Sequence, residues 1–204
     1  MKINRVLLTV LALFLSFTET TAQTIVKDFS SAIESGAVLL ERSNGTGASS
    51  GSSVEGSITN ETDQELNIDV YISKPIYLVN RGSGQNMVAT QVYGRDGGYM
   101  SDGKRSFISL KPRERFPVNF IAYCADFEKD NPSPGESFAV GELPGELAQV
   151  MRNIAVFARA NPDQDITSAA QVAVWLAQGE STADIATKFK FSAEDERLAY
   201  AFLR

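Results

Sequence analysis

The sequence predicts an α+β protein in which strands come first and helices second, and two patterns carry this prediction. From residue 54 to residue 126, short stretches of alternating apolar and polar residues are separated by turns rich in Gly, Asp and Asn. Such spacing is typical of the half-buried strands of an antiparallel β-sandwich. After residues 132–135, apolar residues recur every three or four positions, which is the period of an amphipathic helix. We therefore expect an N-terminal immunoglobulin-like antiparallel β-sandwich followed by a C-terminal helical segment.

Residues 1–22 have the order of a secretory signal peptide. Lys2 and Arg5 precede an apolar run over residues 6–17, and Thr20 and Ala22 are small residues at the positions that a cleavage site requires. A membrane anchor is the alternative, but the apolar run is too short to span a bilayer comfortably. We expect cleavage after Ala22, a mature chain that begins at Gln23, and an exported protein, periplasmic or secreted, that does not associate with the membrane after cleavage.

Composition divides the rest of the chain into four segments. Residues 23–53 are expected to be an N-terminal segment and a linker, because residues 43–53 are almost entirely Gly, Ser, Thr, Asn and Ala. The predicted sandwich occupies residues 54–126. A second linker follows at residues 127–141, and the helical segment occupies residues 142–204.

The strands of the sandwich follow from the alternation and its turns. Residues 60–64 supply a turn after the first strand, and Pro75 ends the second strand or places it at a sheet edge. Residues 81–86 are rich in Gly but lack the Lys and hydroxyl residue of a phosphate-binding loop, so a hairpin loop is expected there. The predicted strands cover residues 54–58, 66–72, 76–79, 87–93, 107–110 and 116–125.

The helices follow from their apolar period and their caps. The first contains residues 147–157 and is ended by Asn161-Pro162. The second begins at Asp165 or Thr167, continues through Gln178, and is ended by Gly179. Two short helices should follow, because residues 181–184 and 192–195 each have the spacing of a capping box.

The composition also limits the possible functions. The chain has 204 residues and no histidine, which excludes Ser-His-Asp and Cys-His catalysis and histidine-based metal sites. A net charge of −6 and a pI near 4.8 disfavour binding to nucleic acid. Residues 161–165 alternate like the opening of a calcium loop, but Ile166 and Val172 stand where that loop has Gly and Glu. We expect no metal and no cofactor.

Residues 176–192 resemble the helix-turn-helix of bacterial DNA-binding regulators. Lys190 stands where that motif usually has Gly, and the second helix would open with acidic residues over 194–196, which repel phosphates. A structural helical hairpin is the favoured interpretation. Phe189, Leu198 and Phe202 are then expected to be buried, and no nucleic-acid partner is expected.

Two residues of unusual chemistry stand out. Cys124, the only cysteine, ends the predicted strand 116–125, and Gln171 lies in a helix that is apolar on nearly every side. A buried carboxamide without partners costs about 1–3 kcal/mol, so Gln171 must be hydrogen-bonded or chemically consumed. The alternative for Cys124 is structural: it shares a strand face with Val118, Phe120 and Ala122, and a free cysteine behaves as a small buried hydrophobe.

The dipeptide Tyr123-Cys124 and the later Gln171-Val172-Ala173-Val174-Trp175 resemble the motifs of thioester domains of bacterial surface adhesins. The resemblance covers residues 120–176, with Ala170 and Val174 where that family has Thr and Ile. It implies that the Cys124 sulfur and the Gln171 acyl group form an internal thioester that reacts with amines on a host surface. Tyr123 and Trp175 would belong to the same binding site, and Trp175 would help to exclude water.

Three functions remain open. The first is an exported, non-catalytic binding or interaction module for a protein or cell-surface ligand. The second is a covalent adhesion module that uses Cys124 and Gln171. The third is a carboxylate-based hydrolase, although no spacing identifies a site. Its candidates would be Asp126, Glu128 and Asp130.

Overall fold

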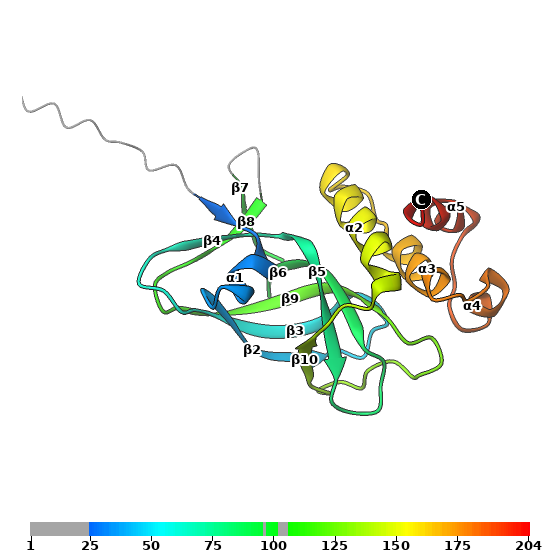
Figure 1. The fold of residues 1–204 in the computed structure, drawn as a ribbon, viewed down its shortest axis with the longest axis horizontal. Coiled ribbons are helices and arrows are strands. Elements are labelled where there is room, and N and C mark those ends of the chain that lie inside the picture. The colour runs from blue at the N-terminus through cyan, green and yellow to red at the C-terminus, as the bar shows by residue number, and fades with distance from the viewer. Residues whose placement is uncertain (1–24, 96, 102–105) are drawn as a thin grey trace, which may run out of the picture.

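The computed structural model describes residues 25–95, 97–101 and 106–204. The predicted signal peptide and its cleavage site lie outside these residues. Figure 1 shows a β-rich part that contains the N-terminal half of the chain and four consecutive helices that lie together beside it. The protein is therefore α+β, with strands first and most helices second, as the sequence predicts.

Six strands form the larger sheet, which is antiparallel throughout. In order across the sheet they are β10 (Phe138–Gly141), β5 (Tyr71–Asn80), β6 (Met87–Gly94), β9 (Arg115–Cys124), β3 (Ser50–Asn60) and β2 (Val38–Gly45). The sequence predicts the centre of this sheet most closely: the ends of β6 and β9 lie within one or two residues of the expected strand ends. Both carry the apolar alternation that buries one face.

A second sheet contains four shorter strands. In order they are β1 (Val26–Lys27), β4 (Leu66–Asp69), β8 (Ser106–Leu110) and β7 (Met100–Ser101). The chain passes from this sheet to the larger one between Asp69 and Tyr71. The predicted single strand over residues 66–72 is thus divided between two sheets, and β5 continues through Pro75. This proline lies where the pairing of β5 with β6 is interrupted, between Tyr71 and Ile76, so its missing N–H costs no rung of that ladder.

Parts of the expected linkers are strands. Residues 43–53, expected to be a loop because they are small and polar, contain the end of β2, which pairs with β3 from residue 54 on, and the start of β3, which pairs with β9. Residues 127–141 end in β10. Composition failed here because pairing with β9 and β5 supplies the backbone hydrogen bonds, whatever the polarity of the side chains. A short helix, α1 (Phe29–Glu34), was also not predicted.

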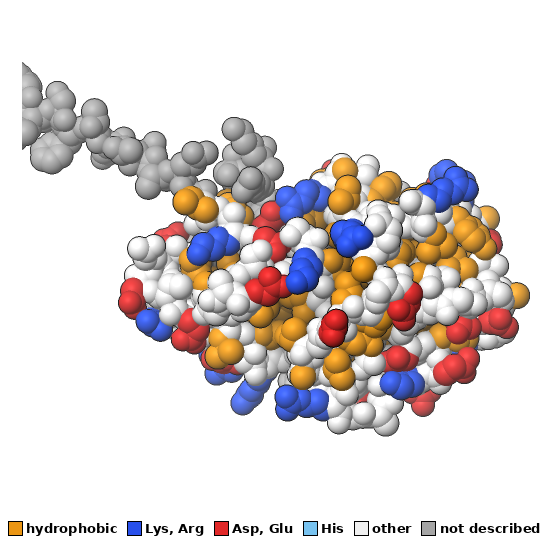
Figure 2. Space-filling view, viewed as in Figure 1, with side chains coloured by type: hydrophobic (Ala, Val, Ile, Leu, Met, Phe, Trp, Pro, Cys, Tyr) orange, Lys and Arg blue, Asp and Glu red, His pale blue; other side chains and the backbone are white. Residues whose placement is uncertain are grey.

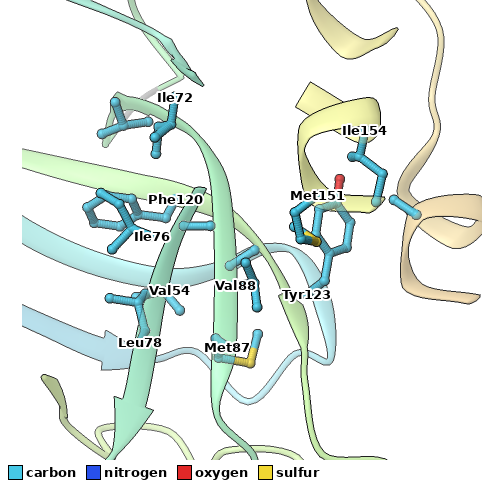
Figure 3. Packing of buried hydrophobic residues seen from close by; sticks show 14 of the residues in the cluster. Val54, Ile72, Ile76, Leu78, Met87, Val88, Phe120, Tyr123, Met151 and Ile154 are labelled. Atoms are coloured by element: carbon cyan, nitrogen blue, oxygen red, sulfur yellow. The ribbon is translucent and has the colours of Figure 1, made fainter. Parts of the chain in front are cut away.

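The core lies between the sheets and continues under the helices. Figure 3 shows Phe120, Ile76, Val54 and Leu78 between the strands, and Tyr123 on the other side of β9, beside Met151. From α1, Phe29 packs against Phe120 with ring centroids 5.7 Å apart. The larger sheet is therefore buried on both faces near its centre, once by the sandwich interior and once by the helical segment.

The helical segment contains α2 (Gly145–Ala160), α3 (Thr167–Ala177), α4 (Thr182–Lys188) and α5 (Ala193–Phe202). All four predicted helices are present. Ser181 and Ser192 cap α4 and α5, and Ser192 forms the full capping box with Asp195. Gly179, with a φ of 98°, follows the end of α3. Within the described ranges, none of the helices has the length and apolar character needed to cross a membrane.

Candidate functional site

Cys124 is the last residue of β9 and is completely buried. Its strand face also carries Val118, Phe120 and Ala122, all fully buried, as the alternation predicts. The Sγ atom lies 3.5 Å from the Met87 Sδ on the neighbouring strand. Burial, together with the negative charge of Asp126, raises the pKa of the Cys124 thiol to about 12. The sulfur is therefore a protonated thiol at neutral pH.

Gln171 lies in α3 and has no exposed surface, which confirms the predicted burial. Its side chain contacts the backbone of Cys124 in both directions. The Cys124 N–H donates to Gln171 Oε1 at 2.9 Å, and Gln171 Nε2 donates to the Cys124 carbonyl at 2.9 Å. The structure thus brings together the two residues on which the thioester resemblance depends, and the carboxamide has a partner for each polar atom.

The carboxamide of Gln171 continues the ladder between β3 and β9. Pairing of these strands begins at Ser50 and Tyr123, and the Cys124 N–H also donates to the Ser49 carbonyl at 3.0 Å. At Cys124 there is no further β3 residue to complete the exchange of hydrogen bonds. Gln171 offers one acceptor and one donor, as a peptide group would, and so joins α3 to the end of β9.

Two further side chains of the helical segment bind the backbone that follows β9. Gln178 donates to the Ala125 carbonyl, and Lys188 donates to the Phe127 carbonyl at 3.1 Å. The Lys188 ammonium also lies 4.2 Å from the centre of the Phe127 ring. Neither residue is predicted from the sequence patterns. Gln178 comes two helical turns after Gln171, so the spacing alone could have placed it on the same face of α3.

Trp175 and Tyr123 lie near this contact but have different surroundings. Trp175 is 3% exposed and packs edge-on against Phe127 and Phe189, with centroid distances of 5.3 and 5.5 Å. It therefore covers the segment directly after Cys124 with aromatic surface. Tyr123 lies on the opposite face of β9 from the thiol, beside Met151, where burial raises its pKa. Its hydroxyl is not placed to assist chemistry at the sulfur.

The arrangement places a nucleophile and an acyl group close together in a dry environment. The sulfur contacts Met87, while the carboxamide is held on the backbone of Cys124. Sγ lies on the strand face that carries Phe120, whereas the helices cover the opposite face beside Tyr123, so a bond requires the end of β9 to turn the sulfur toward the carbonyl carbon of Gln171. In the state described here the pair is a hydrogen-bonded contact.

Two of the three carboxylates proposed for a hydrolase, Asp126 and Glu128, have structural partners. Asp126 accepts from the Asn86 N–H at 2.8 Å and pairs with Lys129 at 3.2 Å. Glu128 pairs with Lys188 at 3.3 Å, and its side chain is 81% exposed. These contacts hold the loop after β9 in place. Among the described residues, no group of three or more His, Cys, Asp or Glu side chains could hold a metal ion.

Residues 176–192, which carry the helix-turn-helix resemblance, contain the end of α3 and all of α4, and the expected second helix is α5. Phe202 is buried as expected and packs edge-on against Phe157 of α2 at 5.3 Å, whereas Phe189 and Leu198 are half-buried. The first turn of α5 carries Glu194, Asp195 and Glu196, and Asp195 is used for capping.

No protein-family model, curated protein or solved structure matches the chain.

Proposed function

We propose that this chain is an exported, non-catalytic binding module that attaches covalently to amine-bearing groups on a protein or cell-surface ligand. The reactive bond is a thioester between Cys124 and Gln171, and the β-rich part is an immunoglobulin-like support for it. One observation carries the proposal: the only cysteine of the chain and a fully buried glutamine 47 residues away are in direct contact. The pairing agrees with the residues that resemble thioester adhesins.

The chemistry balances without a cofactor. The Cys124 sulfur attacks the carbonyl carbon of Gln171, the thiol proton is transferred to the side-chain nitrogen, and ammonia leaves. The product is a thioester that links β9 to α3. A primary amine of the ligand then attacks the same carbon, forms an amide with the Gln171 acyl group, and regenerates the Cys124 thiol.

Burial suits this chemistry because water competes with amines for a thioester. Gln171 and Cys124 have no exposed surface, and Trp175 covers the adjacent segment with Phe127 and Phe189. Exclusion of water slows hydrolysis of the bond. An amine reaches the carbon when α3 and the segment after β9 separate; local opening of this kind admits small amines, and docking of a ligand would favour it.

A second candidate is a module that binds its ligand without covalent chemistry. It is favoured by the two 2.9 Å hydrogen bonds between Gln171 and the backbone of Cys124, which fully account for a buried carboxamide. In this case the contact only fixes the helical segment to the sheet. Export and the absence of a nucleic-acid partner are part of both proposals.

Incubation of the exported protein with a biotin-labelled primary amine distinguishes the two candidates. We expect the label on Gln171, located by peptide mass analysis, together with a newly free thiol at Cys124. Cys124→Ala removes the sulfur but keeps both backbone hydrogen bonds, and it should abolish labelling. A wild-type protein that takes up no label, or a label that persists on Gln171 in Cys124→Ala, would contradict the covalent proposal and leave the second candidate.

A further inference from the structure

The two edge strands of the six-stranded sheet approach each other at one end. Asn44 of β2 and Ser137, just before β10, form an isolated antiparallel bridge. Next to it, the Gly45 N–H donates to the Glu136 carbonyl at 2.8 Å, and Ser43 Oγ donates to the Phe138 carbonyl at 3.4 Å. The sheet is therefore nearly closed at this point.

Beyond this bridge the two edges separate. The register of β2 on β3 shifts between Leu40 and Arg42, and no strand pairing within the described ranges joins residues 38–40 to residues 139–141. A cavity of about 730 Å³ lies in the opening, lined by both strands and by Ile33 and Arg81. Hydrophobic side chains gather in the lower middle of Figure 2, over the region where Figure 1 shows β5 and β10. We call the space between residues 38–40 and 139–141 the β2–β10 opening.

The backbone of both strands presents hydrogen-bonding groups to this opening. The Glu61 N–H donates to the Ala37 carbonyl, so the backbone of residue 37 faces β3 and, by alternation, that of Leu40 faces away from β3. On the other side, the Arg81 N–H donates to the Ser137 carbonyl, so the backbone of Val140 faces away from β5. The N–H and C=O groups of Leu40 and Val140 thus point into the opening from opposite sides.

The opening is lined by exposed apolar side chains together with the charged Glu41, Arg42 and Arg81. Leu39 is 50% exposed and Val140 is 51% exposed. Val140 also lines a smaller hollow of about 170 Å³ together with Ile33, which continues the apolar surface past β10. An exposed sheet edge with apolar side chains is a surface that natural proteins normally cover or charge.

We propose that the β2–β10 opening binds an extended polypeptide segment of a partner protein, which adds a strand between β2 and β10. An extended chain presents N–H and C=O groups on both of its sides, so one segment can bond to Leu40 and Val140 at the same time. Alternate apolar side chains of that segment would contact Leu39 and Val140. The site uses neither Cys124 nor Gln171, and it therefore goes beyond the proposed covalent function.

The test uses the mature protein and an alternating valine–threonine heptapeptide as the probe. Strand addition depends mainly on the backbone, so a generic extended peptide suffices. We expect the peptide to slow hydrogen exchange at the Leu40 and Val140 amides and to leave the exchange of core amides unchanged. Val140→Pro removes the N–H that faces the opening and should weaken peptide binding about fivefold or more.

Two controls keep the test decisive. Val140→Thr keeps the N–H and should retain binding, whereas Ala139→Pro removes an N–H that faces β5 and should destabilise the fold. If Val140→Pro fails to fold, the exchange data on the wild-type protein decide alone. No protection of Leu40 and Val140 at saturating peptide would overturn the proposal. Protection of the same amides by self-association, without peptide, would assign the opening to a second copy of the chain and would also overturn it.

Discussion

Arg159 of α2 and Asp69 at the end of β4 form an ion pair that joins the helical segment to the smaller sheet. The Arg159 Nη2 lies 2.9 Å from Asp69 Oδ2, and the Asp69 side chain is only 10% exposed. The same guanidinium donates to the Tyr71 carbonyl at 3.2 Å and lies over the Tyr71 ring. One side chain thus holds the helices against the point where the chain passes from one sheet to the other.

Arg159→Ala should destabilise the protein because it leaves the Asp69 carboxylate almost buried without its counter-charge. We expect a loss of about 1–3 kcal/mol in the free energy of unfolding. Arg152→Ala is the matched control, since Arg152 is exposed on the same helix and its guanidinium donates to Gln149. Urea unfolding of both variants checks this. Equal stability of the two would show that the Asp69 pair contributes nothing.

Gln171→Ala should also destabilise the protein, because it removes both hydrogen bonds to Cys124 and leaves a cavity in the core. The expected loss is about 2–4 kcal/mol. The same substitution at Gln149, which is exposed on α2, changes helix propensity in the same way and should have an effect near zero. Thermal or urea unfolding measures both. A loss no larger than that of Gln149→Ala would mean that the carboxamide does not hold α3 on the strand.

Stability should fall in alkali when Cys124 carries a free thiol. Burial raises the pKa of this thiol to about 12, whereas in the unfolded chain its pKa is about 8.5. Above that lower value the unfolded chain holds fewer protons than the folded chain, so the free energy of unfolding falls as the pH rises from about 8.5 toward 12. Urea unfolding of amine-treated protein at a series of pH values measures this slope.

Cys124→Ala is the control for the alkaline slope. It should keep the part of the slope that comes from Tyr123, whose pKa burial also raises, and lose the part that comes from the thiol. Protein in which the thioester is intact has no thiol and should behave like Cys124→Ala. An identical slope in all three forms would show that the thiol is not held protonated by burial.

The exported protein should begin at Gln23. The prediction rests on the order of charged, apolar and small residues in the first 22 positions. N-terminal sequencing of exported material decides it. Recovery of Met1 on a membrane-bound protein would mean that the segment is an anchor.

Local sequence patterns predicted the strands and helices whose own side chains show a characteristic period or cap. β6 and β9 alternate, α2 has its apolar stripe, and Ser192 with Asp195 forms the capping box that the spacing indicates. The end of β2 and the start of β3 could not be predicted, because their Gly and Ser residues form strands only through pairing: the end of β2 with the next strand, and the start of β3 with β9, which is distant in sequence. β10 is short and lies within a segment of turn residues, so its pairing with β5 is also a tertiary effect.

Some features of the candidate site could likewise be predicted from the sequence and others could not. The burial of Gln171 follows from its apolar helix, and its contact with Cys124 follows from the resemblance to thioester domains. The hydrogen bonds of the carboxamide to the Cys124 backbone could not be predicted from the sequence. They depend on where β3 begins relative to the end of β9. The contact of Lys188 with the Phe127 carbonyl likewise depends on how α4 docks against the loop after β9.

The intact mass of the exported protein tests the thioester most directly. If Cys124 and Gln171 have reacted, the wild-type protein is lighter than its sequence from Gln23 by the mass of one ammonia, and methylamine raises its mass by that of one methylamine molecule. Cyclisation of an N-terminal Gln23 also expels one ammonia, so Cys124→Ala is the mass reference: relative to its own sequence it should lack one ammonia fewer than the wild-type protein, and it should not change with methylamine. A wild-type protein with the same mass deficit as Cys124→Ala, unaltered by the amine, would contradict the covalent account and identify the pair as a structural contact.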